Sequence, residues 1–180
     1  MDLKKLFVLT AFLAAAGLSQ VGCQSGVLAT PQDGQDYAAG GGQYGDRSVE
    51  AYTRAIDQNP NDADAYFGRG FAYSLNKQYG LAVQDYSKAI ELNPNYANAY
   101  ENRGTVEYRM GLYRSAVDDF TKAIELNPSN ALAYENRAWA DYSLKEYDNA
   151  WRDIHMCRQR GGNPDPTLVE HLSNASGRSD

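Results

Sequence analysis

The chain has 180 residues, a formal net charge of −6 and only two cysteines, Cys23 and Cys157. This length suffices for one domain of ordinary size, and the negative charge argues against a nucleic-acid partner and against binding through a polybasic surface. Neither CxxC nor HExxH spacing occurs, so no metal or other cofactor is expected.

Residues 1–22 have the pattern of a signal peptide. Two lysines precede an apolar run, residues 6–18, that is short for a membrane span but typical of a signal-peptide core. The sequence Val-Gly-Cys ending at Cys23 follows directly and resembles the lipobox of bacterial lipoproteins. That resemblance implies cleavage before Cys23 and acylation of this cysteine. The alternative is an ordinary secretory signal in which Cys23 is incidental.

Several acyl chains on one residue would anchor the chain stably, since a single chain binds membranes only marginally. Gln24, directly after the cysteine, resembles the sorting signal for the outer membrane of Gram-negative bacteria. We therefore expect a lipid-anchored protein of the bacterial cell envelope that faces the periplasm from the outer membrane. Residues 23–45 are rich in glycine and predict a flexible tether. Three consecutive glycines, 40–42, argue against a first helix within this tether.

An internal repeat follows the tether. The segment "KAIELNP" at 88–94 recurs at 122–128, and a weaker copy, "RAIDQNP", precedes them at 54–60, each offset by 34 residues. This period defines three units, which are residues 63–96, 97–130 and 131–164. Each unit holds two helical stretches with apolar residues at three-to-four spacing. One such hairpin cannot bury its apolar face alone, but stacked neighbours can.

This pattern strongly resembles the tetratricopeptide repeat (TPR) family. Five small, aromatic and proline positions of the first unit match the family: Gly70, Ala82, Tyr86, Ala89 and Pro94. The departures are local, since Glu107 and Asp141 replace the aromatic that the first unit has at Tyr73. The resemblance implies an all-α fold, an α-solenoid of about three and a half TPR hairpins in a right-handed superhelix with one concave groove.

Both ends of the array differ from a full unit. Residues 46–62 match only the second helix of a repeat and are expected to form a half repeat. Residues 165–180 predict a capping helix and tail, in which Asp165 caps the start and Pro166 occupies the first turn. Three apolar residues of this helix are expected to cover the last unit: Leu168, Val169 and Leu172.

Each full unit carries an arginine on its first helix and an aspartate 16 residues later on its second. The three pairs are Arg69 with Asp85, Arg103 with Asp119, and Arg137 with Asp153. In the half repeat the arginine position falls in the tether, and the aspartate position is occupied by Ala51. This pattern predicts structural ion pairs between the two helices of each unit. The alternative is that the arginines bind an anionic ligand.

The TPR resemblance implies that the first helix of each unit lines the concave groove. Transferred by position, the partner-binding residues are Phe67, Phe71, Ser74, Glu101, Asn102, Thr105, Tyr108, Glu135, Asn136, Trp139 and Tyr142. Aromatic side chains beside asparagines suit an extended peptide, because an amide side chain pairs with both backbone donors and acceptors. For Phe67 and Phe71 the alternative is packing against the lone helix at 46–59.

No arrangement of a nucleophile with a base indicates an enzyme. Cys157 occupies a small-residue position and is expected to be a buried thiol, and His155 and His171 lie on predicted helices. Some TPR proteins bind chaperone tails through a clamp of lysines, but Phe67 and Leu132 occupy the clamp's lysine positions here. A chaperone-tail clamp is therefore not expected.

The sequence thus predicts a non-catalytic, membrane-anchored adaptor that holds a peptide or helix of a partner protein in its groove. The resemblance to envelope TPR lipoproteins implies a role in assembling or maintaining the cell envelope. The alternative is a structural protein that assembles with further copies of itself. A concentration-independent monomer in light scattering would exclude that alternative.

Overall fold

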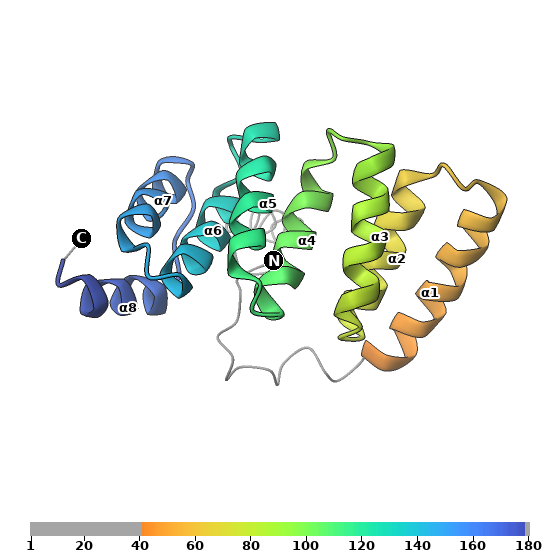
Figure 1. Cartoon of the computed structure of the whole chain (residues 1–180), viewed down its shortest axis with the longest axis horizontal. Coiled ribbons are helices and arrows are strands. Elements are labelled where there is room, and N and C mark those ends of the chain that lie inside the picture. Colours follow the sequence, from red (N-terminus) through yellow and green to blue (C-terminus); the bar gives the residue numbers. More distant parts are fainter. Residues whose placement is uncertain (1–40, 179–180) are drawn as a thin grey trace, which may run out of the picture.

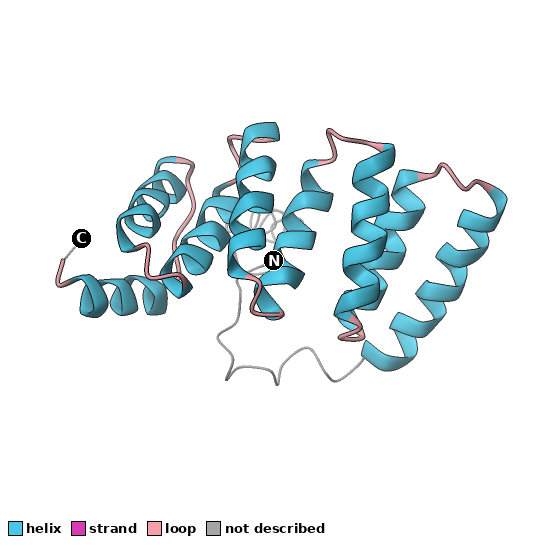
Figure 2. Cartoon of the chain, viewed as in Figure 1, coloured by secondary structure: helices cyan, strands magenta, loops and turns pink. Residues whose placement is uncertain are grey.

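The computed structural model describes residues 41–178, with side chains from residue 49 onwards, and within this range all regular structure is helical (Figures 1 and 2). The signal peptide, Cys23 and the tether up to residue 40 lie outside the described residues. The helices are α1 (Gly41–Gln58), α2 (Ala63–Leu75), α3 (Tyr79–Leu92), α4 (Ala97–Arg109), α5 (Tyr113–Leu126), α6 (Ala131–Ser143), α7 (Tyr147–Gln159) and α8 (Pro166–Ser176).

Consecutive helices pack against one another, and the array extends from α1 at one end to α7 and α8 at the other (Figure 1). The hairpins α2–α3, α4–α5 and α6–α7 coincide with the three sequence units. The expected all-helical array of consecutive hairpins is confirmed. None of the helices in the described part of the chain is long and apolar enough to cross a lipid bilayer.

Local sequence signals begin and end the helices. The Asp62 side chain accepts hydrogen bonds from the N–H groups of Asp64 and Ala65 at 3.0 and 3.1 Å, which caps α2. Asn130 caps α6 in the same way. Helices α3 and α5 both end before an Asn-Pro pair, because the residue before proline is disfavoured in the helical region.

Helix α1 begins at Gly41, earlier than the Asp46 at which we expected the half repeat to start. Its later turns pack on α2, where the Tyr52 ring lies against Gly68; a Cβ on this glycine would come within 2.3 Å of the ring. Because a helix adds residues more easily than it nucleates, a packed segment can extend through glycines that would not start a helix alone. The glycine run therefore does not mark the start of α1, although its composition predicted a break in the helix there.

Helix α8 closes the array. The Asp165 side chain accepts a hydrogen bond from the Thr167 N–H at 2.8 Å, which caps the helix as the sequence indicates. Leu168 and Leu172 are fully buried. They join the largest apolar cluster, whose buried residues come from α5, α6, α7 and α8: Ala116, Phe120, Ala138, Trp139, Ala140, Ala150, Trp151, Ile154, Leu168 and Leu172.

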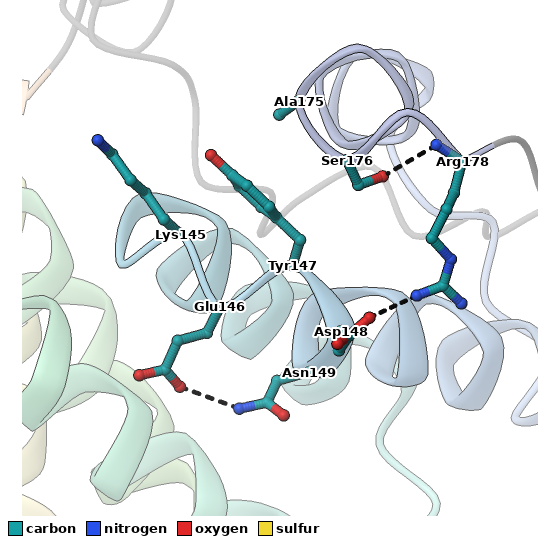
Figure 3. A pocket seen from close by; sticks show the side chains of 8 residues that line it. All are labelled: Lys145, Glu146, Tyr147, Asp148, Asn149, Ala175, Ser176 and Arg178. Atoms are coloured by element: carbon teal, nitrogen blue, oxygen red, sulfur yellow. Dashed lines mark hydrogen bonds and ion pairs between the residues drawn. The ribbon is translucent and has the colours of Figure 1, made fainter.

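The far end of α8 is attached mainly by polar contacts. The Trp151 Nε1–H donates to Ser176 Oγ at 3.1 Å, and Arg178 forms an ion pair with Asp148. Between this end of α8 and the start of α7 lies a shallow depression of about 490 Å³, lined by polar and partly exposed side chains (Figure 3).

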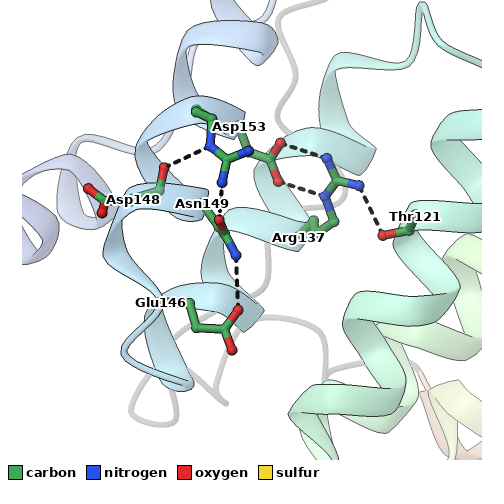
Figure 4. A network of polar contacts seen from close by, with 7 residues as sticks. Thr121, Arg137, Glu146, Asp148, Asn149 and Asp153 are labelled. Carbon is green, nitrogen blue, oxygen red and sulfur yellow. Dashed lines mark hydrogen bonds and ion pairs between the residues drawn. The ribbon is translucent and has the colours of Figure 1, made fainter.

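The predicted arginine–aspartate pairs are formed in all three hairpins with the same geometry. In the second hairpin, Arg103 Nε and Nη2 donate to the two Asp119 carboxylate oxygens, each at 2.7 Å. The remaining terminal nitrogen, Nη1, donates to Ser87 Oγ at 2.9 Å, a hydroxyl on the preceding hairpin. Figure 4 shows the same arrangement in the third hairpin, where Arg137 contacts Asp153 and Thr121.

Each arginine therefore joins three helices, and we call this arrangement an arginine clip. The hydroxyl partners recur with the 34-residue period, since Thr53, Ser87 and Thr121 are equivalent positions. The next equivalent residue is His155, after which no further clip arginine follows. The hydroxyl thus occurs where a following hairpin needs it. A tyrosine on the same helix as each arginine, such as Tyr100 at 5.7 Å from the Arg103 guanidinium, adds a cation–π contact.

We expect Arg103→Ala and Asp119→Ala each to lower the free energy of unfolding by about 3–5 kcal/mol, because each leaves its partner as an unpaired, largely buried charge. The double variant should lose much less than the sum of the two, since the second change removes the orphaned partner. Urea unfolding monitored by circular dichroism measures both effects.

The exposed pair of Lys122 and Glu125 is the control for this cycle. Lys122→Ala should change the free energy of unfolding by less than about 1 kcal/mol. Strictly additive losses, or clip variants as stable as the wild type, would show that the pair is not a structural brace.

Candidate functional site

The groove face is the side of α2, α4 and α6 that carries the predicted partner-binding residues. The structure divides this face into two parts. On α2 and α4 most of its side chains retain solvent access, whereas on α6 the C-terminal helix covers them.

On α2 the two predicted phenylalanines differ. Phe71 is 46% exposed, as an accessible contact residue would be. Phe67 is partly buried, with its ring stacked on Tyr96 at 5.0 Å and tilted against Tyr86 at 5.7 Å. Phe67 therefore packs against its own hairpin and against the start of the next hairpin.

On α4 the predicted residues are partly exposed, and two of them are bonded to their own helix. Asn102 Nδ2 donates to the Asn98 carbonyl oxygen at 2.8 Å, and Thr105 Oγ1 donates to the Glu101 carbonyl oxygen at 2.9 Å. Tyr108 is partly buried, with its ring tilted against a neighbouring tyrosine at 5.2 Å. These side chains could exchange their local bonds for bonds to a partner.

One predicted groove position has a structural role that sequence reasoning missed. The residue at this position contacts the N-cap residue of the first helix of the next hairpin or, in the third hairpin, the N-cap residue of α8. The contacts are Phe67 stacked on Tyr96, Glu101 Oε2 accepting from Asn130 Nδ2 at 2.7 Å, and Glu135 Oε1 accepting from the Asp165 N–H at 2.8 Å. Burial raises the pKa of both glutamates. The two contacting residues are separated by nearly the same number of residues in each case, and this spacing could have indicated the contact from the sequence.

The structure corrects the prediction for α6. Glu135, Asn136 and Trp139 are 0%, 1% and 3% exposed, so a partner cannot reach them while α8 is in place. The His171 ring of α8 packs edge-on against Trp139 at 6.1 Å and stacks on Tyr142 at 5.7 Å. The sequence predicted that α8 would cap the end of the array but not that it would lie over the groove face.

Two buried carboxyl groups lie beside the clips, on the helices that also carry Arg103 and Arg137. Glu107 Oε2 and Asp141 Oδ1 are buried and form no hydrogen bond with any residue that the structure describes. Burial, reinforced by the Asp119 charge, raises the pKa of Glu107 to about 7. Burial, reinforced by the Asp153 charge, raises the pKa of Asp141 to about 6. No described group of three or more acidic, histidine or cysteine residues could hold a metal ion.

Comparison with family models identifies the class of the protein. The tetratricopeptide repeat model matches residues 63–96 and 97–130, and a second TPR repeat model matches residues 41–77. Together these matches extend over residues 41–130, half of the chain. The chain belongs to the tetratricopeptide repeat family. The third hairpin, α6–α7, continues the array and has the same clip geometry.

Solved structures with the same fold include two of MamA. The crystal structure of MamA is 24% identical, covers 65% of this chain and 68% of that one, and has a TM-score of 0.63. MamA 41-end from Desulfovibrio magneticus RS-1 is 19% identical, covers 74% and 75%, and has a TM-score of 0.66. At these identities the likeness concerns the fold alone. A search of curated proteins returns no match.

A third similar structure is the first TPR of Spaghetti (RPAP3) bound to the HSP90 peptide SRMEEVD. It is 23% identical, covers 64% of this chain and 90% of that one, and has a TM-score of 0.59. Stacked hairpins of this family form extended concave surfaces for binding. The chain is accordingly a TPR protein-binding scaffold, with a fold that is typically non-catalytic.

The buried acids generate a prediction about pH. Their folded pKa values lie above those of an unfolded chain, so the folded state favours their protonated forms. Their contribution to stability is complete below the unfolded pKa values and is lost as the pH rises through about 6 to 7. We expect Glu107→Gln with Asp141→Asn to raise the melting temperature at pH 8 and to have a much smaller effect at pH 5.

Thermal melts across this pH range, measured by circular dichroism, make the comparison. The exposed Asp57, changed to asparagine, is the matched control and should give a difference from wild type that varies little with pH. A double variant less stable than the wild type at pH 8 would contradict the prediction.

Proposed function

We propose that this protein is a membrane-anchored TPR adaptor that holds a peptide or helix of a partner protein on the groove face of α2 and α4. The observation that carries the proposal is an exposed apolar strip on α2. Phe71 and Leu75, one helical turn apart, are 46% and 49% exposed. Large apolar side chains grouped on an accessible surface are typical of a protein–protein contact.

The groove face also limits the chemistry of the partner. Phe67 and Leu132 stand at the positions where the TPR clamp for chaperone tails has lysines, and the accessible α2 surface includes the acidic Asp64. An acidic peptide would gain no lysine contact at these positions. We therefore propose that the apolar side chains of the bound peptide pack on Phe71 and Leu75. Its backbone N–H and C=O groups would form hydrogen bonds with the amide and hydroxyl side chains of α4.

The proposed location is the periplasmic side of the outer membrane, with Cys23 as the acylated anchor. The lipobox-like sequence and the residue that follows it support this location. A flexible tether would allow the folded array to reach partners near the membrane surface. We infer from these features that the adaptor acts in assembling or maintaining the cell envelope.

Removing the exposed apolar and amide groups should abolish partner binding without unfolding the array. We expect Phe71→Ala with Asn102→Ala to reduce the partner recovered by affinity capture from cross-linked membranes by about tenfold or more. Trp139 is left unchanged, because it is buried beneath α8 and its loss would disturb the core.

The matched control is Leu81→Ala, which removes a 41% exposed leucine from α3, a second helix outside the groove face. This variant should capture the same partners as the wild type. Recovery of the same partners at the same yield with the double variant would place the binding surface elsewhere.

A Cys23→Ala variant tests the anchor. We expect it to move from the membrane fraction to the soluble fraction, provided that the size of the mature chain shows that the signal peptide has been removed. Fractionation followed by immunoblotting measures the distribution. A processed variant that stays in the membrane fraction would exclude acylation of Cys23 as the anchor.

A further inference from the structure

The surface beneath α8 differs from the equivalent surface of the preceding hairpin. Asn102 on α4 retains solvent access although α6 packs beside it, whereas its equivalent Asn136 is 1% exposed. Trp139, on the next turn of α6, packs against His171 of α8. Helix α8 therefore covers part of the groove face that a regular hairpin leaves open. The chain itself occupies the end of its groove.

The apolar part of this contact is specific and small. Leu168 and Leu172, four residues apart on one face of α8, are fully buried against α6 and α7. Val169 is only partly buried, and the exposed residues of α8 are mostly polar. The receptive surface on α6 and α7 thus recognises an amphipathic helix through a pair of leucines one turn apart.

The polar part of the contact is incomplete. Glu135 Oε2, Asn136 Oδ1 and Trp139 Nε1 are buried and form no hydrogen bond within the described residues. A buried polar atom without a partner destabilises the packed state. All three atoms belong to the groove face of α6, where two could accept hydrogen bonds and one could donate. A different occupant with complementary groups could bind this surface better than α8 does.

The attachment of α8 at its far end suits a helix that can leave. At its start, by contrast, the Asp165 N–H donates to Glu135 Oε1 at 2.8 Å, so we expect opening to begin at the far end. At its far end, the side chains of the Arg178–Asp148 ion pair are 56% and 85% exposed, and a shallow depression separates α8 from the start of α7 (Figure 3). An exposed ion pair contributes little to stability.

We propose that α8 is a displaceable occupant of the groove and that the surface beneath it is a second docking segment. Its partner is an amphipathic helix that, like α8, carries leucines four residues apart. This proposal rests on the proposed function, because it extends the same groove face from α2 and α4 to α6. When α8 is displaced, Glu135, Asn136 and Trp139 become exposed. A partner helix therefore reaches this surface only by competing with α8.

Hydrogen exchange of the wild-type protein tests whether α8 can leave. We expect amide protection in α8 to be lower than in α6 and α7 by about tenfold or more, because α8 opens while the hairpin stays folded. Equal protection in all three helices would mean that α8 leaves only on global unfolding, and this result would overturn the proposal.

A synthetic peptide of residues 165–178 with a fluorescent label tests whether the uncovered surface accepts a helix. In the full-length variant Leu168→Asp with Leu172→Asp, the chain's own α8 should detach. Fluorescence anisotropy should then show the peptide binding this variant about tenfold or more tightly than the wild type. A control peptide with the same two aspartates should bind neither protein.

Absence of binding to a variant whose hairpins keep their wild-type helicity would overturn the proposal. If that variant unfolds, His171→Ala, which removes the ring contacts with Trp139 and Tyr142, is the second variant and should bind the peptide more tightly than the wild type. Phe71→Ala with Asn102→Ala should leave peptide binding unchanged. Failure of the peptide-binding experiment is therefore distinguishable from failure of the capture experiment with the Phe71 and Asn102 variant.

Discussion

The array depends on an arginine that is shared between neighbouring hairpins. In each clip two guanidinium nitrogens bind the aspartate of the same hairpin, and the third reaches a hydroxyl of the preceding one, as Arg103 does with Asp119 and Ser87. The planar guanidinium suits this task, because its donors point in fixed directions that match a carboxylate. One side chain thus sets both the pairing within a hairpin and the stacking between hairpins.

The clips do not involve the groove-face residues of the first helices, so these residues are available for other contacts. The contacts differ between α2 and α6. On α2 the exposed Phe71 offers an apolar contact, whereas on α6 the face is closed by α8. The buried acids Glu107 and Asp141 lie where the first hairpin has Tyr73, so a buried carboxyl oxygen without a hydrogen bond among the described residues lies beside two of the three clips. The array therefore combines a regular frame with variable positions on one face.

Sequence reasoning predicted the parts of this structure that repeat. The 34-residue period placed the hairpins and paired each clip arginine with its aspartate, because equivalent residues in stacked units have equivalent neighbours. It missed the repeated hydroxyl partners of the clips and the repeated contacts of Phe67, Glu101 and Glu135. It also failed where a residue's neighbour belongs to no repeated position. Helix α1 extends into the glycine run to Gly41, and Trp139 is covered by α8, since both outcomes depend on how the ends of the array pack.

The sequence by itself determined the number of full hairpins, their boundaries and their internal ion pairs, because these follow from periodic spacing along the chain. Only the tertiary structure decided which groove residues remain accessible. Phe67 and Phe71 are both aromatic and one turn apart, yet one stacks on Tyr96 and the other is exposed. Exposure depends on the elements that pack across a helix from elsewhere in the chain, and a linear pattern does not contain that information.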